Sequence, residues 1–325
     1  MAIFTIIRFI FEETDYYPVL CSMYKKNERE AYRALENGYY HFCTDGLKDG
    51  ELFNSAEEYA FGMTLIGMMS HLFSLKIYAF TLMSNHVHII LSGTGANCLQ
   101  AFDYLKRKLS ARLKRDGYAP LPEEYWFKLV EITTPEQMRS EIIYVLRNPL
   151  EKGLAMVEGY LWGSGWLYYS GFGELIDLHS SDKKSTRENR KLTGGHEPVP
   201  GDWRFHPYLG LHPACFVDTA LVKKLFPEAK DLQTALVKDY EVVFQIASRL
   251  GEICEFNKAE QESIVSQTLQ KRFNGRSLNT LSEEDKGKLA IILNREFGFN
   301  SYQISTNIYI KEKVIRQLLS SKELR

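Results

Sequence analysis

The sequence contains no run of about 18 consecutive apolar residues, the length that a membrane-spanning helix needs. We therefore expect no transmembrane segment and no membrane partner. Cysteine is also scarce, and its five residues are scattered without Cys-x-x-Cys spacing: Cys21, Cys43, Cys98, Cys215 and Cys254. This pattern argues against a disulfide framework and a zinc knuckle, and it favours a reducing, cytoplasmic location.

The chain has little excess charge of either sign, because 40 Lys and Arg oppose 41 Asp and Glu. A protein with this balance that binds nucleic acid must carry its positive surface locally. Its 325 residues, 45% of them hydrophobic, suffice for two or three domains with cores of their own. The apolar start at 2–11 lacks a basic export-signal region, so we expect a strand or interaction arm there, within an N-terminal arm at 1–37.

The stretch from Ile77 to Leu91 predicts two apolar strands that turn at Ser84 and Asn85. The second strand begins His86-Val-His88, and side chains two positions apart on a strand share a face. Two neighbouring imidazoles on a rigid strand are able to bind one divalent cation. The pair is also compatible with an ordinary polar strand face, in which each ring hydrogen-bonds to a neighbour.

A second segment, Glu141-Ile-Ile-Tyr-Val-Leu-Arg-Asn-Pro149, has the apolar spacing of a helix that stops at Pro149. Tyr144 and Asn148 are four residues apart and therefore share a face of that helix. The segment thus presents one phenol and one amide oxygen together.

Together, Met83-Ser-Asn-His-Val-His88, Tyr144-Val-Leu-Arg-Asn-Pro149 and Gly153-Leu154 resemble the HUH-type single-tyrosine transposases, in particular the REP-associated tyrosine transposase branch. Ser84 and Val145 replace the usual Pro and Ile of that pattern. The resemblance covers about residues 38 to 170. The expected order of strand, helix, two strands, helix and a further helix suggests a compact α+β domain, in which an antiparallel sheet carries its helices on one face. The resemblance implies the ferredoxin-like (RRM-like) version of that fold.

The resemblance also implies a chemistry. Tyr144 would be the nucleophile of a metal-dependent single-stranded DNA endonuclease and strand-transferase that forms a 5′-phosphotyrosine intermediate beside a DNA hairpin. His86, His88 and Asn148 would hold the divalent metal, and two nitrogens with one oxygen accept magnesium or manganese. Relatives include both monomers and swapped homodimers, so either state is compatible with the sequence.

The densest positive stretch follows the paired strands, on a helix expected from about Cys98 to Arg115. It comprises Lys106, Arg107, Lys108, Arg112, Lys114 and Arg115. Such a run is compatible with a solvated helix face. Beside a DNA-cutting site, however, it would neutralise successive phosphates, and binding would then weaken steeply with salt.

Composition suggests the domain boundaries. We expect the nuclease domain at 38–179, a flexible basic linker at 180–201, and a mainly helical domain at 202–325. Before the linker, residues 160–170 gather several aromatic side chains. These are suited to core packing, and they are also able to stack on unpaired bases.

The pattern at 282–320 indicates a long helix, a short helix, a tight turn and a third helix, as in a helix-turn-helix. On the third helix Val314, Ile315 and Leu318 should face the core. The residues expected to face double-stranded DNA are Lys311, Lys313, Arg316 and Gln317. A plain three-helix bundle fits the same spacing.

Two other functions fit parts of the sequence. A domesticated DNA-binding regulator would keep this fold and the helix-turn-helix without turnover, but it has no need of intact His86, His88, Tyr144 and Asn148. An RNA-binding module of the RRM type would require aromatic residues on the strand face where the two histidines stand.

Overall fold

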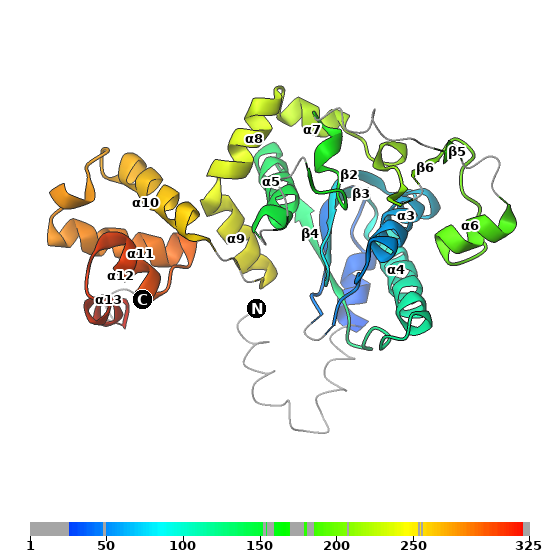
Figure 1. The fold of residues 1–325 in the computed structure, drawn as a ribbon, viewed down its shortest axis with the longest axis horizontal. Coiled ribbons are helices and arrows are strands. Elements are labelled where there is room, and N and C mark those ends of the chain that lie inside the picture. Colours follow the sequence, from blue (N-terminus) through cyan, green and yellow to red (C-terminus); the bar gives the residue numbers. More distant parts are fainter. Residues whose placement is uncertain are drawn as a thin grey trace, which may run out of the picture. The chain divides into compact units, whose positions relative to one another are not determined.

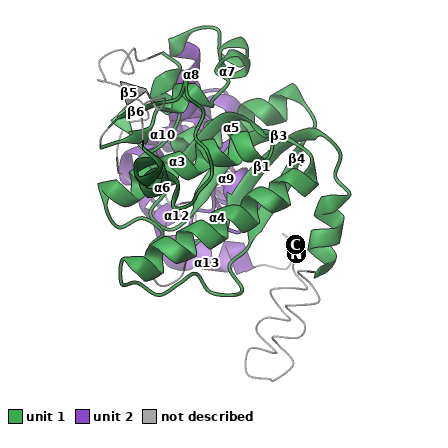
Figure 2. Ribbon diagram, turned by 90° about the vertical axis from the view of Figure 1, so that its right-hand side faces the viewer, with its two compact units in different colours: residues 1–150, 154–229 green, residues 151–153, 230–325 purple. Residues whose placement is uncertain are grey.

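The computed structural model describes residues 26–47, 50–151, 154, 159–169, 179–180, 185–206, 208–252, 254 and 256–320. The chain forms two compact units (Figure 2). Unit 1 comprises residues 1–150 and 154–229, and unit 2 comprises residues 151–153 and 230–325. The apolar stretch predicted at 2–11 lies outside the described residues.

A four-stranded antiparallel sheet forms the centre of unit 1 (Figure 1). Its strands are β1 (Gly38–Thr44), β2 (Lys76–Leu82), β3 (Val87–Gly93) and β4 (Phe127–Ile132), in the spatial order β2-β3-β1-β4. Helix α3 (Ala56–Leu72) connects β1 to β2, and helix α4 (Gly95–Arg115) connects β3 to β4. The predicted α+β class, the antiparallel sheet and the turn between β2 and β3 are confirmed.

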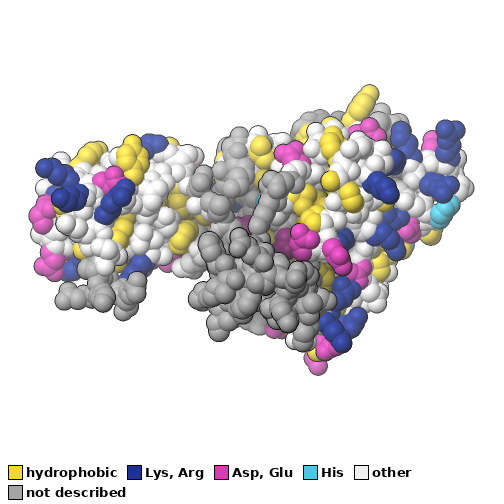
Figure 3. Space-filling view, turned by 90° about the horizontal axis from the view of Figure 1, so that it is seen from below, with side chains coloured by type: hydrophobic (Ala, Val, Ile, Leu, Met, Phe, Trp, Pro, Cys, Tyr) yellow, Lys and Arg dark blue, Asp and Glu magenta, His cyan; other side chains and the backbone are white. Residues whose placement is uncertain are grey.

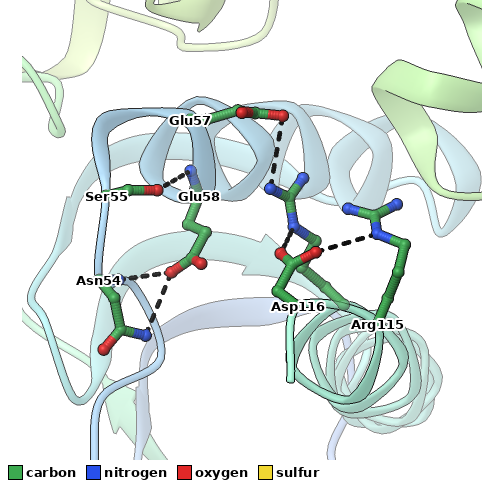
Figure 4. Close-up of polar contacts among 7 residues, drawn as sticks. Asn54, Ser55, Glu57, Glu58, Arg115 and Asp116 are labelled. Atoms are coloured by element: carbon green, nitrogen blue, oxygen red, sulfur yellow. Dashed lines mark hydrogen bonds and ion pairs between the residues drawn. The ribbon is translucent and has the colours of Figure 1, made fainter. Parts of the chain in front are cut away.

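The N-terminus of α3 is fixed by side-chain caps, as Figure 4 shows. The hydroxyl of Ser55 accepts a hydrogen bond from the backbone N–H of Glu58 at 3.3 Å. The carboxylate of Glu58 in turn accepts from the backbone N–H of Asn54 at 2.5 Å. Because these bonds satisfy donors that a helix start would otherwise leave without partners, the helix begins where Ser55 stands.

Strand alternation separates two kinds of side chain on the sheet. Phe42, Val87 and Ile89 point to the face that α3 and α4 cover and lie in one core with Phe102 and Leu105. His41 and His88 alternate with these residues and therefore point to the opposite face.

Helix α5 (Pro135–Glu151) covers this second face, as Figure 1 shows on the side of the sheet away from α3 and α4. The expectation that all helices lie on one face was therefore wrong. His41 and His88 alternate with core residues along their strands, which leaves the second face partly polar. Helix α5 covers that face with the buried side chains of Glu141 and Tyr144, which lie against His41 and His88.

We predicted that this helix stops at Pro149, but α5 contains Pro149. Proline has no N–H, so the carbonyl of Val145, four residues earlier, lacks its usual helical donor. The hydroxyl of Thr81 on β2 donates to this carbonyl at 2.8 Å. One sheet residue thus compensates for the proline and fixes the position of α5 on the sheet.

The predicted linker at 180–201 contains folded structure. Helix α6 (Thr186–Thr193) begins with a capping box between Ser185 and Glu188. A small sheet is formed by β5 (His179–Ser180), which precedes α6, and by β6 (Arg204–His206) and β7 (Gly210–Leu211), which come after it. The two units divide near residue 229, which differs from the expected boundary at 180–201.

The aromatic segment at 160–170 packs into the core of unit 1 as far as it is described. Tyr160, Trp166 and Tyr168 are all buried. The Tyr160 hydroxyl donates to the Leu82 carbonyl at 2.6 Å, and the Tyr168 hydroxyl donates to the Tyr78 carbonyl at 2.6 Å. These rings therefore hold the chain against the outer strand β2. Short elements complete unit 1, namely η2 (Gly165–Leu167), η4 (Pro213–Cys215) and α7 (Ala220–Leu225).

Unit 2 is helical. After α8 (Ala229–Lys238), which begins at the boundary, it comprises α9 (Tyr240–Leu250), α10 (Lys258–Arg272), η5 (Leu278–Thr280), α11 (Glu283–Phe297), α12 (Ser301–Ile308) and α13 (Glu312–Ser320). The last three helices lie where the sequence predicted them. Ile315 is buried in their core with Leu293 and Ile304, but Val314 is 50% exposed, so its predicted place in the core was wrong. In the described part of the chain, no helix is both long and apolar enough to cross a bilayer.

Candidate functional site

Three buried side chains from three elements meet between the second sheet face and α5. Nδ1 of His41 on β1 lies 2.8 Å from the carboxylate of Glu141 on α5. Nε2 of His41 lies 3.1 Å from Nδ1 of His88 on β3. Strands β1 and β3 are neighbours in the sheet, and Cys43 pairs with His88, so His41 is the diagonal neighbour that a ring can reach.

Tyr144 belongs to the same cluster. Its ring centroid lies 5.5 Å from that of His88, nearly perpendicular to it, and 6.0 Å from that of His41. The side chain is only 2% exposed. Glu141, Tyr144 and Asn148 recur at intervals of three and four residues and so occupy one face of α5. The structure therefore brings the phenol of one predicted motif next to an imidazole of the other.

His86 lies just before β3, and its ring centroid is 4.7 Å from that of His88. Nδ1 of His86 lies 2.7 Å from Oδ1 of Asn85, which orients the ring. In both histidines Nδ1 has a hydrogen-bond partner, so a metal would be bound through Nε2. Two adjacent imidazoles held in this way fit a divalent cation.

Asn148 lies one turn beyond Tyr144 on α5 and is 2% exposed. Its amide oxygen is a neutral oxygen ligand of the kind that magnesium and manganese accept. The donor types of His86, His88 and Asn148 are therefore compatible with such an ion.

Four other tyrosines of unit 1 have contacts that indicate structural roles. Tyr104 and Tyr125 pack in the core on the first sheet face, across the sheet from the histidines, and burial raises the pKa of both phenols. The hydroxyls of Tyr40 and Tyr169 donate to the carbonyls of Glu36 and Phe226. Tyr144 differs from these phenols because its ring contacts His88.

Four of the six residues of the predicted basic patch on α4 form polar contacts within the protein. Lys106 donates to the carbonyls of Glu123 and Tyr125 at 2.7 and 2.9 Å. Lys108 is buried and pairs with Glu197 at 2.8 Å. Arg112 forms ion pairs with Asp116 and with Glu57 of α3. Arg115 also pairs with Asp116 at 3.1 Å, a contact that Figure 4 shows.

Arg107, Lys114 and Arg115 remain exposed on α4. In Figure 3, Lys and Arg side chains are spread, with acidic groups between them, over the part of unit 1 where α4 and α6 lie. Because α4 covers the first sheet face, these cations and the histidine cluster lie on opposite sides of the sheet.

In unit 2, the predicted DNA-facing residues of the last helix and the turn before it are all exposed, namely Lys311, Lys313, Arg316 and Gln317. Arg316 also forms an ion pair with Glu312 at 2.8 Å, and this hydrogen-bonded contact lowers the pKa of the Glu312 carboxyl. A partner that contacts Lys311, Lys313 or Gln317 would therefore leave the ion pair between Arg316 and Glu312 intact.

His41 and Glu141 were not among the predicted site residues. Two signals were present: His41 is a polar residue between Tyr40 and Phe42 in an apolar strand, and Glu141 lies on the Tyr144 face of its helix. The contact between His41 and Glu141 depends on the order of the strands and on α5 covering the second face. The spacing of residues along the sequence reveals neither of these.

No protein-family model matches the chain, and no curated protein matches it. Among solved structures, it is similar to one described as "Structure of the REP associates tyrosine transposase bound to a REP hairpin". The sequence identity is 14% and the TM-score 0.34, over 41% of this chain and 80% of that chain. The functional assignment therefore rests on the residues of this chain.

Proposed function

We propose that this protein is a metal-dependent single-stranded DNA endonuclease and strand-transferase, that is, a transposase-like enzyme. The observation that carries the proposal is the position of Tyr144 beside His88, with His86 next to it. Two motifs 56 residues apart in the sequence thus form one cluster. The element order strand, helix, strand, strand, helix, strand, with sheet order β2-β3-β1-β4, supports the ferredoxin-like plan that the motifs imply.

Tyr144 is the proposed nucleophile. Its phenolic oxygen forms a bond to the phosphorus of the scissile phosphodiester and the bond from phosphorus to the 3′ oxygen breaks. The phenol gives its proton to water, and the departing 3′ oxygen takes one up from water. The products are a 5′-phosphotyrosine and a free 3′-hydroxyl. Because the new phosphodiester retains the energy of the old one, a 3′-hydroxyl can later reverse the step and rejoin the strands.

A phenol has an ordinary pKa of about 10 and is a weak nucleophile at neutral pH without assistance. His86, His88 and Asn148 would hold magnesium or manganese. When bound, such an ion supplies Lewis-acid stabilisation of charge on the phosphoryl oxygens. The contribution of α5 is to place the Tyr144 hydroxyl against the phosphate.

The proposed partner is single-stranded DNA beside a hairpin. Exposed Arg107, Lys114 and Arg115 of α4 would contact its phosphates. Because these residues lie across the sheet from the cluster, the DNA must pass around the sheet edge to reach both. Lys311, Lys313, Arg316 and Gln317 would contact double-stranded DNA if α11 to α13 act as a helix-turn-helix.

The burial of Tyr144 favours a second candidate, a DNA-binding regulator of the same fold without turnover. A phenol that is 2% exposed cannot reach a phosphate unless α5 or its surroundings move. In the enzyme, binding of DNA or metal must open this site. In a silent regulator no such opening is required.

Incubation of labelled hairpin-bearing single strands with the protein and manganese separates the two candidates. The enzyme is expected to give a protein–DNA adduct that survives denaturation, and Tyr144→Phe should abolish it. Tyr118→Phe is the matched control, because Tyr118 is a phenol of the same unit that is 46% exposed and should retain full adduct formation. Binding without any adduct would support the regulator.

A further inference from the structure

Two hydrogen bonds join Glu141, His41 and His88 into one buried line from α5 through β1 to β3. His41, His88 and Glu141 are each 0% exposed. Neither His41 nor Glu141 is one of the proposed metal ligands, and neither is the proposed nucleophile. A buried polar line of this kind is costly unless every member is satisfied, so its place beside the site calls for a role.

The donor directions along this line are constrained. An ionised carboxylate only accepts hydrogen bonds, so Nδ1 of His41 must carry the proton that faces Glu141. In a neutral imidazole the other nitrogen is then an acceptor, so Nε2 of His41 accepts from Nδ1–H of His88. His88 in turn presents Nε2 with its lone pair, the form that binds a metal.

We propose that Glu141 and His41 are positioning residues that fix the orientation and the tautomer of His88, so that its Nε2 faces a divalent cation. This inference rests on the proposed function and deepens it. It assigns two residues that act through His88 without touching the metal or the DNA. A carboxylate that holds a ligating histidine through hydrogen bonds is a recurrent device at metal sites, but here a second imidazole lies between them.

The first test needs no substitution. In the full-length protein labelled with ¹⁵N-histidine and kept free of metal, long-range proton–nitrogen spectra distinguish protonated from unprotonated ring nitrogens. We expect a protonated Nδ1 and an unprotonated Nε2 for both His41 and His88. Assignment of the His88 signals uses their loss in His88→Ala. A His88 ring protonated at Nε2, with His41 protonated at both nitrogens, would overturn the relay.

The second test measures manganese affinity by calorimetry in variants whose circular dichroism matches the wild type. His41→Phe should weaken manganese binding by roughly 10- to 100-fold, because His88 loses its acceptor. Glu141→Gln should weaken it less, since the amide oxygen still accepts from His41. Glu136→Gln is the matched control, an exposed Glu at the start of the same helix, and it should leave the affinity unchanged.

Failure of the relay and failure of the proposed function give different results. If His88→Ala abolishes manganese binding while His41→Phe and Glu141→Gln bind as the wild type does, the relay is wrong and the metal site stands. If manganese binding does not depend on His88, the metal site of the proposed function is wrong, and the relay with it. Should His41→Phe not fold, Glu141→Gln and the spectra of the wild type carry the test.

Discussion

Thr81 is a sheet residue whose side chain compensates for a proline in the helix that carries the proposed nucleophile. Its hydroxyl donates to the Val145 carbonyl, which Pro149 leaves without a helical donor. Tyr144 precedes that carbonyl by one residue. Any loss of this hydrogen bond should therefore affect both the stability of unit 1 and the position of the phenol.

We predict that Thr81→Val destabilises the protein by about 1–3 kcal/mol, because a buried carbonyl loses its partner. Pro149→Ala restores an N–H at residue 149, so Thr81→Val should cost less in that background. Urea unfolding of the two single variants and the double variant measures the coupling. If Thr81→Val lowers the free energy of unfolding equally in both backgrounds, the Thr81 hydroxyl does not compensate for the missing N–H of Pro149.

Lys108 was predicted to bind DNA, but its contacts give it a structural role. It is buried, lies over the Tyr104 ring at 5.1 Å and pairs with Glu197. Burial of Glu197 is the largest single effect on its pKa and opposes ionisation. The hydrogen bond from Lys108, a backbone hydrogen bond and the charges of Lys108 and Arg107 together nevertheless lower the pKa of the carboxyl below its ordinary 4.5. A lowered carboxyl pKa stabilises the fold above the unfolded-state pKa, and this stabilisation is lost as pH falls through the folded pKa.

Lys108→Met should consequently destabilise the protein at neutral pH, and the difference from wild type should shrink as the pH falls below the folded pKa of Glu197. Urea unfolding at neutral pH and below pH 4.5 provides the measurement. The variant should bind DNA with the same salt dependence as the wild type. If Lys108→Met reduced the salt dependence of DNA binding and left stability unchanged, Lys108 would be a DNA-binding residue and its structural role would be wrong.

At the scale of elements, α4 presents two sets of cations with different expected behaviour. Arg107, Lys114 and Arg115 are exposed, whereas Lys106 is held by two backbone carbonyls. Each lost contact to a single-stranded phosphate reduces the slope of log affinity against log salt by about 0.7. The triple variant Arg107→Ala, Lys114→Ala, Arg115→Ala should therefore lower this slope by about 2.

The control for this prediction is Lys106→Met on the same helix, which should leave the slope unchanged and reduce stability instead. Fluorescence anisotropy of a labelled hairpin oligonucleotide over a series of salt concentrations measures both. An unchanged slope in the triple variant would mean that α4 presents a solvated face and that the DNA binds elsewhere.

The sequence predicted elements well where the signal was local. The turn at Ser84 and Asn85 and the three helices after Ser282 follow from turn residues and apolar spacing. The continuation of α5 through Pro149 was missed because its compensation comes from Thr81, 64 residues away. The spacing of residues within the helix cannot reveal a contact with a residue so distant in the sequence.

The folded segment after residue 180 was missed for a related reason. Its composition is that of a linker, and α6 contributes few apolar side chains. It is capped by Ser185 and Glu188, and Lys108 of α4 pairs with Glu197 just beyond it. Of the candidate site, the residues of the two motifs were predictable, whereas His41 and Glu141 required the strand order and the side of the sheet that α5 covers.

At the scale of the whole molecule, the two units suit different tasks. Unit 1 contains all the proposed ligands and the proposed nucleophile, namely His86, His88, Asn148 and Tyr144. Unit 2 contributes exposed cations on α13 and in the turn before it. We therefore expect variants of Lys311, Lys313, Arg316 and Gln317 to change the choice of DNA and its affinity, while cleavage of a saturating hairpin substrate continues.

The central claim is that the oxygen of Tyr144 becomes covalently attached to DNA. The measurement that tests it most directly is mass spectrometry of the protein after reaction with a hairpin-bearing single strand in manganese, followed by nuclease and protease digestion. The account predicts a peptide that carries a 5′-linked nucleotide on Tyr144. A nucleotide on another tyrosine, or a cleaved strand without any modified peptide, would contradict it.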